Sequence, residues 1–218
     1  MKEKGNIFDG IISGAFYDRV AALFGFGPRL IKKAMDLIPV KPGQRILDLG
    51  CGTGLFCLAL ADRLGGGGEI HGVDLSKKQL DRARIKLAEK GVPFVLHRCS
   101  MDKLPFEAAS FDMVVSSLAI HAVDPTLRRT AIKEATRVLK PGGSFILVDW
   151  TRPQAFLPRV WYFRFSPYVM GEKAKDNWFN TYPDMCRNEN LVPGADRFIS
   201  PYVRCQCFSK ASVPDRRG

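Results

Sequence analysis

The sequence predicts an α/β fold in which a mostly parallel, doubly wound sheet carries helices on both faces. Apolar runs typical of strands alternate with the apolar spacing typical of helices. The predicted strands lie near 45–50, 70–74, 93–98, 111–117 and 143–149, and the predicted helices near 55–64, 77–90 and 126–139. Such a sheet binds ligands outside the carboxyl ends of its strands. The residues at these ends are therefore expected to converge on one rim: Gly50, Asp74, Ser100, Ser117 and Asp149.

A glycine-rich loop follows the first predicted strand. Gly50, Gly52 and Gly54 lack Cβ atoms where the chain must turn sharply and approach a ligand, and a helical pattern begins directly afterwards. Asp74 ends the next apolar run about 20 residues later, where an acid can accept two ribose hydroxyls. The spacing Asp-x-Gly-x-Gly-x-Gly differs from the dinucleotide pattern G-x-G-x-x-G. The loop therefore favours another nucleoside cofactor, and the alternative is a tight strand-to-helix turn that binds nothing.

The ends of the chain complete this architecture. Residues from about 16 to 38 have a helical pattern with a break at 25–28. Two strand-like runs at 197–200 and 202–208 flank Pro201, which can bend or bulge the chain between them. The length of 218 residues and the hydrophobic content of 46% favour one domain with one substantial core.

Several motifs together resemble class I S-adenosylmethionine (SAM)-dependent methyltransferases. The stretch 48–54 is similar to the first motif of that family. Further matching stretches follow in the same order: Gly72-Val73-Asp74-Leu75-Ser76, Leu104-Pro105-Phe106, Phe111-Asp112-Met113-Val114-Val115, and 134–143. Within the family the chain resembles the ubiquinone and menaquinone biosynthesis-like (methyltransferase type 11) group, from near Ala15 to about Asp149. The resemblance implies a Rossmann-like sheet of seven strands with an antiparallel strand near the C-terminus and an N-terminal helical cover over 1–40.

The resemblance also implies which residues bind SAM. The expected cofactor-binding residues are Asp48, Gly50, Cys51, Gly52, Gly54, Asp74, Leu75, Ser100, Met101 and Ser117. Asp48 is expected to balance the ammonium group directly or through water. Asp74 is expected to bind the ribose, and the alternative is a helix N-terminal charge beside a capping Ser76. No metal site is expected.

The third cofactor element departs from the family pattern. Where the family has Gly-Asp-Ala-Glu before Leu-Pro-Phe, this chain has Cys99-Ser100-Met101-Asp102. Ser100 therefore replaces the acid that binds the adenine amino group, and its hydroxyl can still accept a hydrogen bond. Either Ser100 retains the role with a weaker bond, or Asp102 takes it over, or Asp102 is an exposed turn residue.

His121 follows the fourth predicted strand, where the family places the wall between cofactor and substrate. As a neutral base, His121 could take a proton from the methyl acceptor. The equal alternative is a hydrogen-bonded residue that shapes the cofactor pocket, because the sequence shows no acid that would partner the imidazole. Next to it, Asp124 and Pro125 are typical of an N-cap followed by the first helical position.

The segment 150–190 matches the family least and is rich in aromatic residues interleaved with arginines. We expect it to form a lid over a small or amphipathic, quinone- or lipid-like substrate, or to contact an anionic membrane surface. Helix packing against the sheet is the alternative for any single aromatic residue. An RNA or protein methyltransferase, or a SAM-binding module without catalysis, stays open as the alternative function.

Composition limits the remaining choices. The net charge of +11 suggests an acidic partner, nucleic acid included, although the basic residues are spread along the chain. The six cysteines show no paired metal-ligand spacing, so free thiols are expected. No apolar run reaches the roughly 18 residues of a membrane span, and the N-terminus is too charged for a secretory signal. These features predict a cytoplasmic protein, and they leave its oligomeric state open.

Overall fold

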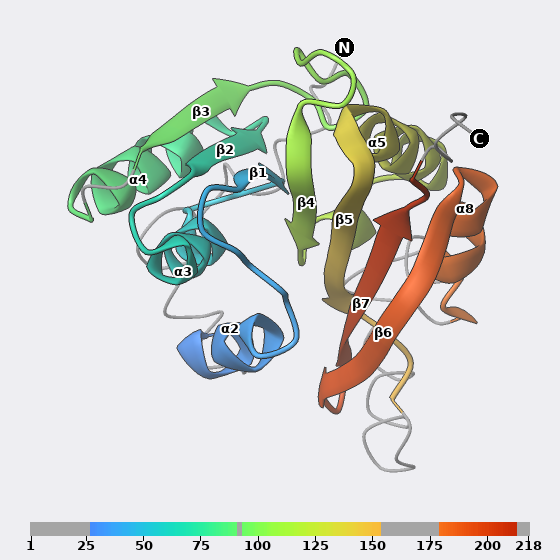
Figure 1. Cartoon of the computed structure of the whole chain (residues 1–218). Coiled ribbons are helices and arrows are strands. Elements are labelled where there is room, and N and C mark those ends of the chain that lie inside the picture. The colour runs from blue at the N-terminus through green and yellow to red at the C-terminus, as the bar shows by residue number, and fades with distance from the viewer. Residues whose placement is uncertain (1–26, 91–92, 154–178, 213–218) are drawn as a thin grey trace.

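A seven-stranded sheet forms the centre of the protein, as the computed structural model shows for residues 27–90, 93–153 and 179–212 (Figure 1). The strands are β1 (Arg45–Leu49), β2 (Glu69–Asp74), β3 (Phe94–Arg98), β4 (Phe111–Ser117), β5 (Leu139–Trp150), β6 (Leu191–Ser200) and β7 (Val203–Lys210), in the spatial order β3-β2-β1-β4-β5-β7-β6. The first five strands pair in parallel, and β7 is antiparallel to both β5 and β6. The predicted Rossmann-like sheet with an antiparallel C-terminal strand is confirmed.

Helices cover the two faces of the sheet unequally. The helices are α2 (Pro28–Met35), α3 (Leu55–Leu64), α4 (Lys77–Ala88), α5 (Pro125–Val138) and α8 (Tyr182–Asn188), with a short 3₁₀ turn η1 (Ile120–Ala122). One apolar core joins α2, α3 and α4 to one face, and a second core joins α5 and α8 to the other. The order of the strands reverses between β1 and β4, which is the place where a doubly wound sheet binds its ligands.

Two helices begin where the sequence predicts. The carboxylate of Asp124 accepts a hydrogen bond from the backbone N–H of Leu127 over 3.0 Å, and Pro125 occupies the first turn of α5. Ser76 caps α4 by accepting a hydrogen bond from the Gln79 N–H over 3.3 Å. Local capping chemistry therefore fixes the start of the helices that follow β2 and β4.

The C-terminal strands differ from the prediction in extent. β6 begins at Leu191, well before the predicted run at 197–200, and contains register shifts between Pro193 and Asp196 and between Phe198 and Ser200. These irregularities break the apolar alternation that identifies a strand, because one residue is inserted against the partner strand. Pro201 lies in the two-residue turn between β6 and β7, where a missing N–H costs no ladder hydrogen bond.

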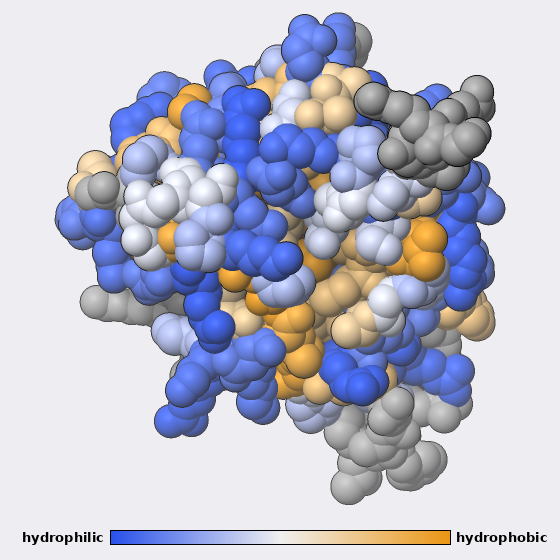
Figure 2. All heavy atoms as spheres, in the orientation of Figure 1, coloured by the Kyte–Doolittle hydropathy of each residue, from blue (hydrophilic) through white to orange (hydrophobic). Residues whose placement is uncertain are grey.

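The N-terminal cover is only partly described. Helix α2 begins at Pro28, next to the predicted break at 25–28, and packs its buried face against the core that includes α3 and β7. Residues 1–26 lie outside the described residues, so the first part of the expected cover over 1–40 remains a prediction. Figure 2 shows apolar residues at the surface between α2 and the C-terminal strands.

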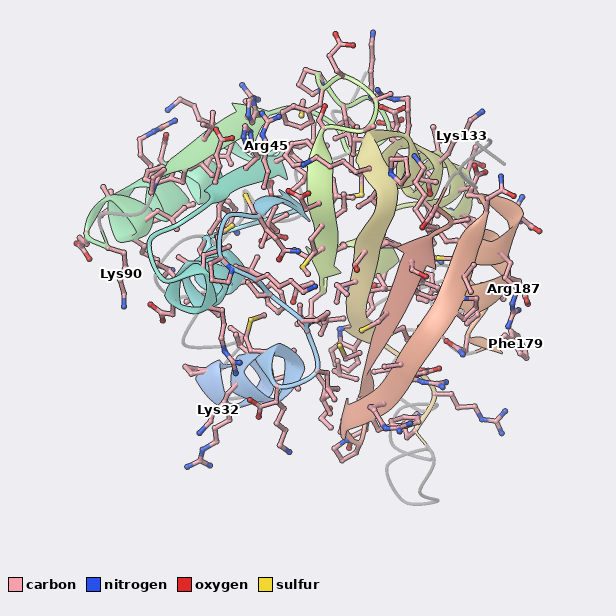
Figure 3. All side chains as sticks on the ribbon, in the orientation of Figure 1. Lys32, Arg45, Lys90, Lys133, Phe179 and Arg187 are labelled. Atoms are coloured by element: carbon pink, nitrogen blue, oxygen red, sulfur yellow. The ribbon has the colours of Figure 1, made fainter. Side chains whose placement is uncertain are left out.

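Basic side chains point outward from several separate elements. Figure 3 shows Lys32 on α2, Lys90 after α4, Lys133 on α5 and Arg187 on α8 at different edges of the molecule. The charge is therefore spread over the described surface in the way the sequence suggests.

Within the described ranges, no helix has the length and apolar character needed to cross a membrane. The six cysteines are free thiols, and the described residues contain no cluster of side chains arranged to hold a metal ion.

Candidate active site

The glycine loop adopts a conformation that suits glycine at each predicted position. Gly50, Gly52 and Gly54 have φ angles of +74°, +53° and +80°, in the left-handed region that residues with a Cβ rarely adopt. A Cβ atom on Gly50 would also lie 2.4 Å from the Cβ of Ala119. The loop after β1 therefore presses directly against the segment after β4, and the absence of a side chain permits that approach.

Asp74, at the end of β2, accepts two backbone hydrogen bonds. Its Oδ2 accepts from the N–H of Gly52 over 3.0 Å, and its Oδ1 accepts from the N–H of Ser76 over 2.8 Å. The carboxylate thus ties the glycine loop to the start of α4. The two roles considered from the sequence are compatible, because a carboxylate has about four acceptor positions.

Asp48, in β1 beneath the loop, is buried with 1% of its surface exposed. The thiol of Cys57 donates a hydrogen bond to its Oδ2 over 3.2 Å, whereas Oδ1 has no hydrogen-bond partner in the described part of the chain. Burial raises the pKa of the Asp48 carboxyl to about 7, the Cys57 hydrogen bond lowers it, and the charge of Asp74 raises it further. A buried carboxylate oxygen without a donor is costly unless a ligand supplies one.

The residues that depart from the family pattern, 99–102, directly follow β3. The Ser100 hydroxyl donates a hydrogen bond to the carboxylate of Asp102, so these two residues form one polar unit after the strand. Met101 approaches the glycine loop, because a Cβ on Gly50 would lie 3.5 Å from its Cε atom. The structure thus places Met101 beside the loop, with Ser100 next to it in the chain and Asp102 hydrogen-bonded to Ser100.

The remaining predicted cofactor residues differ in surroundings. Cys51 is buried, and its sulfur lies under the loop, since a Cβ on Gly72 would be 2.8 Å from it. Leu75 is 40% exposed, and its carbonyl accepts a hydrogen bond from Arg98 over 3.1 Å. Ser117 ends β4 opposite Val148 of β5 and is half-buried. All three lie at or directly after the carboxyl ends of strands, where Ser117 was predicted to lie.

His121 has the acidic partner that the sequence did not reveal. Its Nδ1 lies 2.6 Å from Oδ1 of Asp149, and its backbone N–H donates to Oδ2 of the same carboxylate over 3.0 Å. Asp149 belongs to β5, the strand next to β4, and only 2% of its side chain is exposed. The adjacency of the carboxyl ends of β4 and β5 is the signal that could have identified this pair.

Two further residues hold this region and were not identified from the sequence. Arg128 of α5 is fully buried and donates hydrogen bonds to the carbonyls of Ile120, His121 and Val123 over 3.1–3.2 Å. Its guanidinium lies 5.6 Å from the ring centroid of Tyr182 in α8, whose hydroxyl donates to Oδ2 of Asp149 over 3.4 Å. In a sequence, an arginine on a helix is typical of an exposed residue, so its burial gives no local signal.

The fold, the glycine loop and the buried acid beneath it define the class of the protein. The sheet order, the acid-and-glycine loop after β1 and the acid at the end of β2 are together those of class I SAM-dependent methyltransferases. Residues 46–143 match a family model described as a methyltransferase domain, which covers the strands β1 to β4 and the start of β5. The chain is accordingly a member of the class I SAM-dependent methyltransferases, and SAM is its cofactor.

Individual known proteins also resemble this chain. The chain is 35% identical over 158 residues to a demethylmenaquinone methyltransferase of Bacillus velezensis and 34% identical over 158 residues to the one of Bacillus subtilis. Both matches span 71% of this chain and 66% of the relative, so part of each relative has no counterpart in the match. A SAM-dependent methyltransferase from Aquifex aeolicus has a similar fold, with a TM-score of 0.70 at 16% identity, over 89% of this chain and 95% of its own.

Proposed function

We propose that this protein transfers the methyl group of SAM to a quinone-like small molecule. The observation that carries the cofactor part of the proposal is the buried Oδ1 of Asp48, which has no partner in the described part of the chain and lies beneath the glycine loop. A cationic ammonium group would supply the missing donor and charge. The acceptor part is supported by the identity to demethylmenaquinone methyltransferases.

The residues around the loop have distinct proposed roles. Gly50, Cys51, Gly52 and Gly54 would bring backbone C=O groups close to the amino-acid part of the cofactor, because their N–H groups all donate hydrogen bonds within the chain. Asp48 would balance its ammonium group.

Asp74 and Leu75 would bind the ribose, with the Asp74 carboxylate accepting from hydroxyl donors. Ser100 and Met101 would bind the adenine. The Ser100 hydroxyl already donates to Asp102, so its remaining lone pairs are free to accept from an amino group. Ser117, at the end of β4, would line the boundary between cofactor and acceptor.

For methyl transfer, the protein mainly has to position the acceptor atom and to exclude water from the site. Bound SAM supplies an electrophilic methyl group on a positively charged sulfur. The protein's contribution is to hold the acceptor atom in line with that methyl group, which is worth several kcal/mol in comparable reactions. The segment 150–190, the expected lid, lies mostly outside the described residues, since 154–178 are not described. Its role over the acceptor therefore remains part of the proposal.

An apolar acceptor agrees with the surroundings of the site. In Figure 1 the carboxyl ends of β4 and β5 point toward the side of the molecule where α2 lies, and Figure 2 shows apolar surface between α2 and the C-terminal strands. Leu37 and Leu118 are partly buried against the core on this side. The described basic residues form no comparable single patch, so nothing in the structure favours RNA over a quinone-like molecule.

Two measurements test the proposal. Calorimetric titration with S-adenosylhomocysteine and SAM is expected to show binding, and NAD is expected to show none. Incubation with methyl-labelled SAM and a chemically reduced, short-chain demethylmenaquinone is expected to transfer label to the quinol. Binding without transfer to the quinol would refute the proposed acceptor, and absence of binding would refute the cofactor site. Asp74→Ala is expected to weaken the binding of both SAM and S-adenosylhomocysteine. Its matched control is Asp62→Ala, which changes an exposed aspartate on α3.

A further inference from the structure

We propose that Asp149 is a positioning residue. Its carboxylate orients His121 so that the imidazole accepts a proton from the molecule that receives the methyl group. The inference rests on the proposed function and deepens it, because it names the chemical property that the acceptor must have. It also assigns roles to Arg128 and Tyr182, which hold the two residues in place.

The hydrogen bonds of Asp149 determine which imidazole nitrogen carries the hydrogen. Oδ1 accepts from the backbone N–H of Trp150 over 2.8 Å, and Oδ2 accepts from the backbone N–H of His121 over 3.0 Å. A backbone N–H can only donate, so both oxygens serve as acceptors, which is the role of an ionised carboxylate. The 2.6 Å contact between Oδ1 and Nδ1 of His121 therefore has Nδ1–H as the donor. The lone pair of the neutral ring lies on Nε2, which has no hydrogen-bond partner within the described ranges.

Hydrogen bonds from α5 hold the backbone around His121 in place. Arg128 donates to three carbonyls of the segment 120–123, and its guanidinium lies over the ring of Tyr182. The Tyr182 hydroxyl in turn donates to Oδ2 of Asp149 over 3.4 Å. Because Arg128 and Tyr182 are both fully buried, the imidazole and the carboxylate are attached to one packed unit formed by α5, α8 and β5. Such support keeps a catalytic side chain within a narrow range of positions.

The same segment borders the cofactor loop. Ala119, two residues before His121, is the residue that the missing side chain of Gly50 accommodates. Leu118 turns the chain at the end of β4 with a φ of +53°, a strained conformation for a leucine and one that is often found at functional sites. The side chain of His121 keeps 14% of its surface exposed, whereas that of Asp149 is almost completely buried. His121 is thus the member of the pair that a substrate can reach.

This geometry defines the class of acceptor. His121 Nε2 takes the proton of a hydroxyl group on the acceptor, and the carboxylate of Asp149 stabilises the imidazolium that results. The acceptor's O–H bond breaks, and the electron pair that remains, on the oxygen or on the conjugated ring carbon, forms the bond to the methyl carbon. When the ring carbon attacks, the hydrogen on that carbon is afterwards lost as a proton and the oxygen is reprotonated, which restores the aromatic quinol. The carbon–sulfur bond breaks, and its electrons stay on sulfur as a neutral thioether. A hydroquinone or phenol has such a proton, whereas a tertiary amine does not.

A first experiment separates turnover from binding. With a reduced, short-chain demethylmenaquinone as acceptor, His121→Gln and Asp149→Asn are expected to lower kcat at least about 100-fold. Their affinity for S-adenosylhomocysteine should stay within about threefold of the wild-type value. Asp184→Asn, which changes an exposed aspartate of α8, is the matched control. Equal losses of turnover and cofactor binding would overturn the proposal.

A second experiment needs no activity. The chain has three histidines, so ¹⁵N imidazole spectra recorded with and without the His121→Gln change identify the signals of His121. At alkaline pH the wild type is expected to show a protonated Nδ1 and an unprotonated Nε2, and Asp149→Asn is expected to lose this preference. A hydrogen on Nε2 of the neutral wild-type ring would overturn the inference. If the expected spectra are obtained but no quinol is methylated, the proposed acceptor fails and the His121–Asp149 pair stands.

Discussion

The backbone N–H of Gly52 donates a hydrogen bond to Oδ2 of Asp74 over 3.0 Å. This bond joins the carboxyl ends of β1 and β2 through their loops, and the second oxygen of Asp74 binds the backbone at the start of α4. The acid therefore shapes the glycine loop before any cofactor arrives. Substitutions at Asp74 can separate this structural role from the proposed binding of the ribose.

Asp74→Ala is expected to weaken the binding of S-adenosylhomocysteine by about 10- to 150-fold, because hydrogen bonds to a charged group contribute roughly 1.5–3 kcal/mol. Asp74→Asn, which keeps the shape and one acceptor oxygen, should lose less. Calorimetric titration measures both affinities, with Asp62→Ala as the control. An Asp74→Ala protein that folds and binds with unchanged affinity would refute the ribose role.

The buried carboxyl of Asp48 predicts that cofactor binding depends on pH. Burial raises the pKa of Asp48 to about 7, and an ammonium group favours the ionised form. Affinity for S-adenosylhomocysteine should therefore rise as the pH increases from 5.5 to 7 and level off above 7. Below pH 7, binding should release the proton, at about 0.9 per ligand at pH 6.

Titration at pH 6 in two buffers of different ionisation enthalpy measures the released proton. Asp48→Asn is the matched variant, because it keeps the shape of the side chain and cannot ionise. It should bind more weakly above pH 7 and show neither proton release nor the pH dependence. Binding to the wild type without proton release at pH 6 would show that Asp48 does not face the ammonium group.

Gly50→Ala is expected to abolish measurable cofactor binding and to lower the melting temperature. The new Cβ would lie 2.4 Å from that of Ala119, and the φ of +74° is strained for alanine. Gly43→Ala is the control, since Gly43 has a similar φ of +81° and open space around it. Thermal unfolding and titration compare the two proteins. Equal effects of both changes would mean that backbone strain alone, and not the contact between the two loops, causes the loss.

The parts of the fold that depend on local sequence were predictable. Alternating apolar runs, the caps Ser76 and Asp124, and the glycine loop gave the parallel strands and the helices between them, because each signal lies within a few residues of its effect. The partner of His121 could not be found in this way, since Asp149 is 28 residues away and the two meet only when β5 pairs beside β4. Arg128 was missed for a related reason. Its burial depends on the carbonyls of a short 3₁₀ turn and the ring of Tyr182, which only the tertiary structure brings together.

Two of the three histidines form a cluster away from the site, in which His71 is buried and His97 is half-buried. Nδ1 of His71 lies 3.1 Å from Nε2 of His97, and the other nitrogen of His71 lies 3.1 Å from a carboxylate oxygen of Glu69. Phe106 and Phe111 pack edge-on against the ring of His71. Burial lowers the pKa of both histidines, and the positive charge of Arg45 lowers them further, while Glu69 opposes the effect at His71.

This cluster predicts that acid destabilises the protein. Because the folded state lowers the pKa of both histidines, the unfolded chain binds more protons below about pH 6.5, and the free energy of unfolding should fall as the pH drops from 7.5 to 5.5. Asp48 acts in the opposite direction, since its raised pKa makes ionisation costly between about pH 4 and 7. The double variant His71→Gln, His97→Gln removes only the first contribution. Urea unfolding across this pH range should give a steeper acid loss for the wild type than for the variant, and parallel curves would show that the two histidines do not titrate with unfolding.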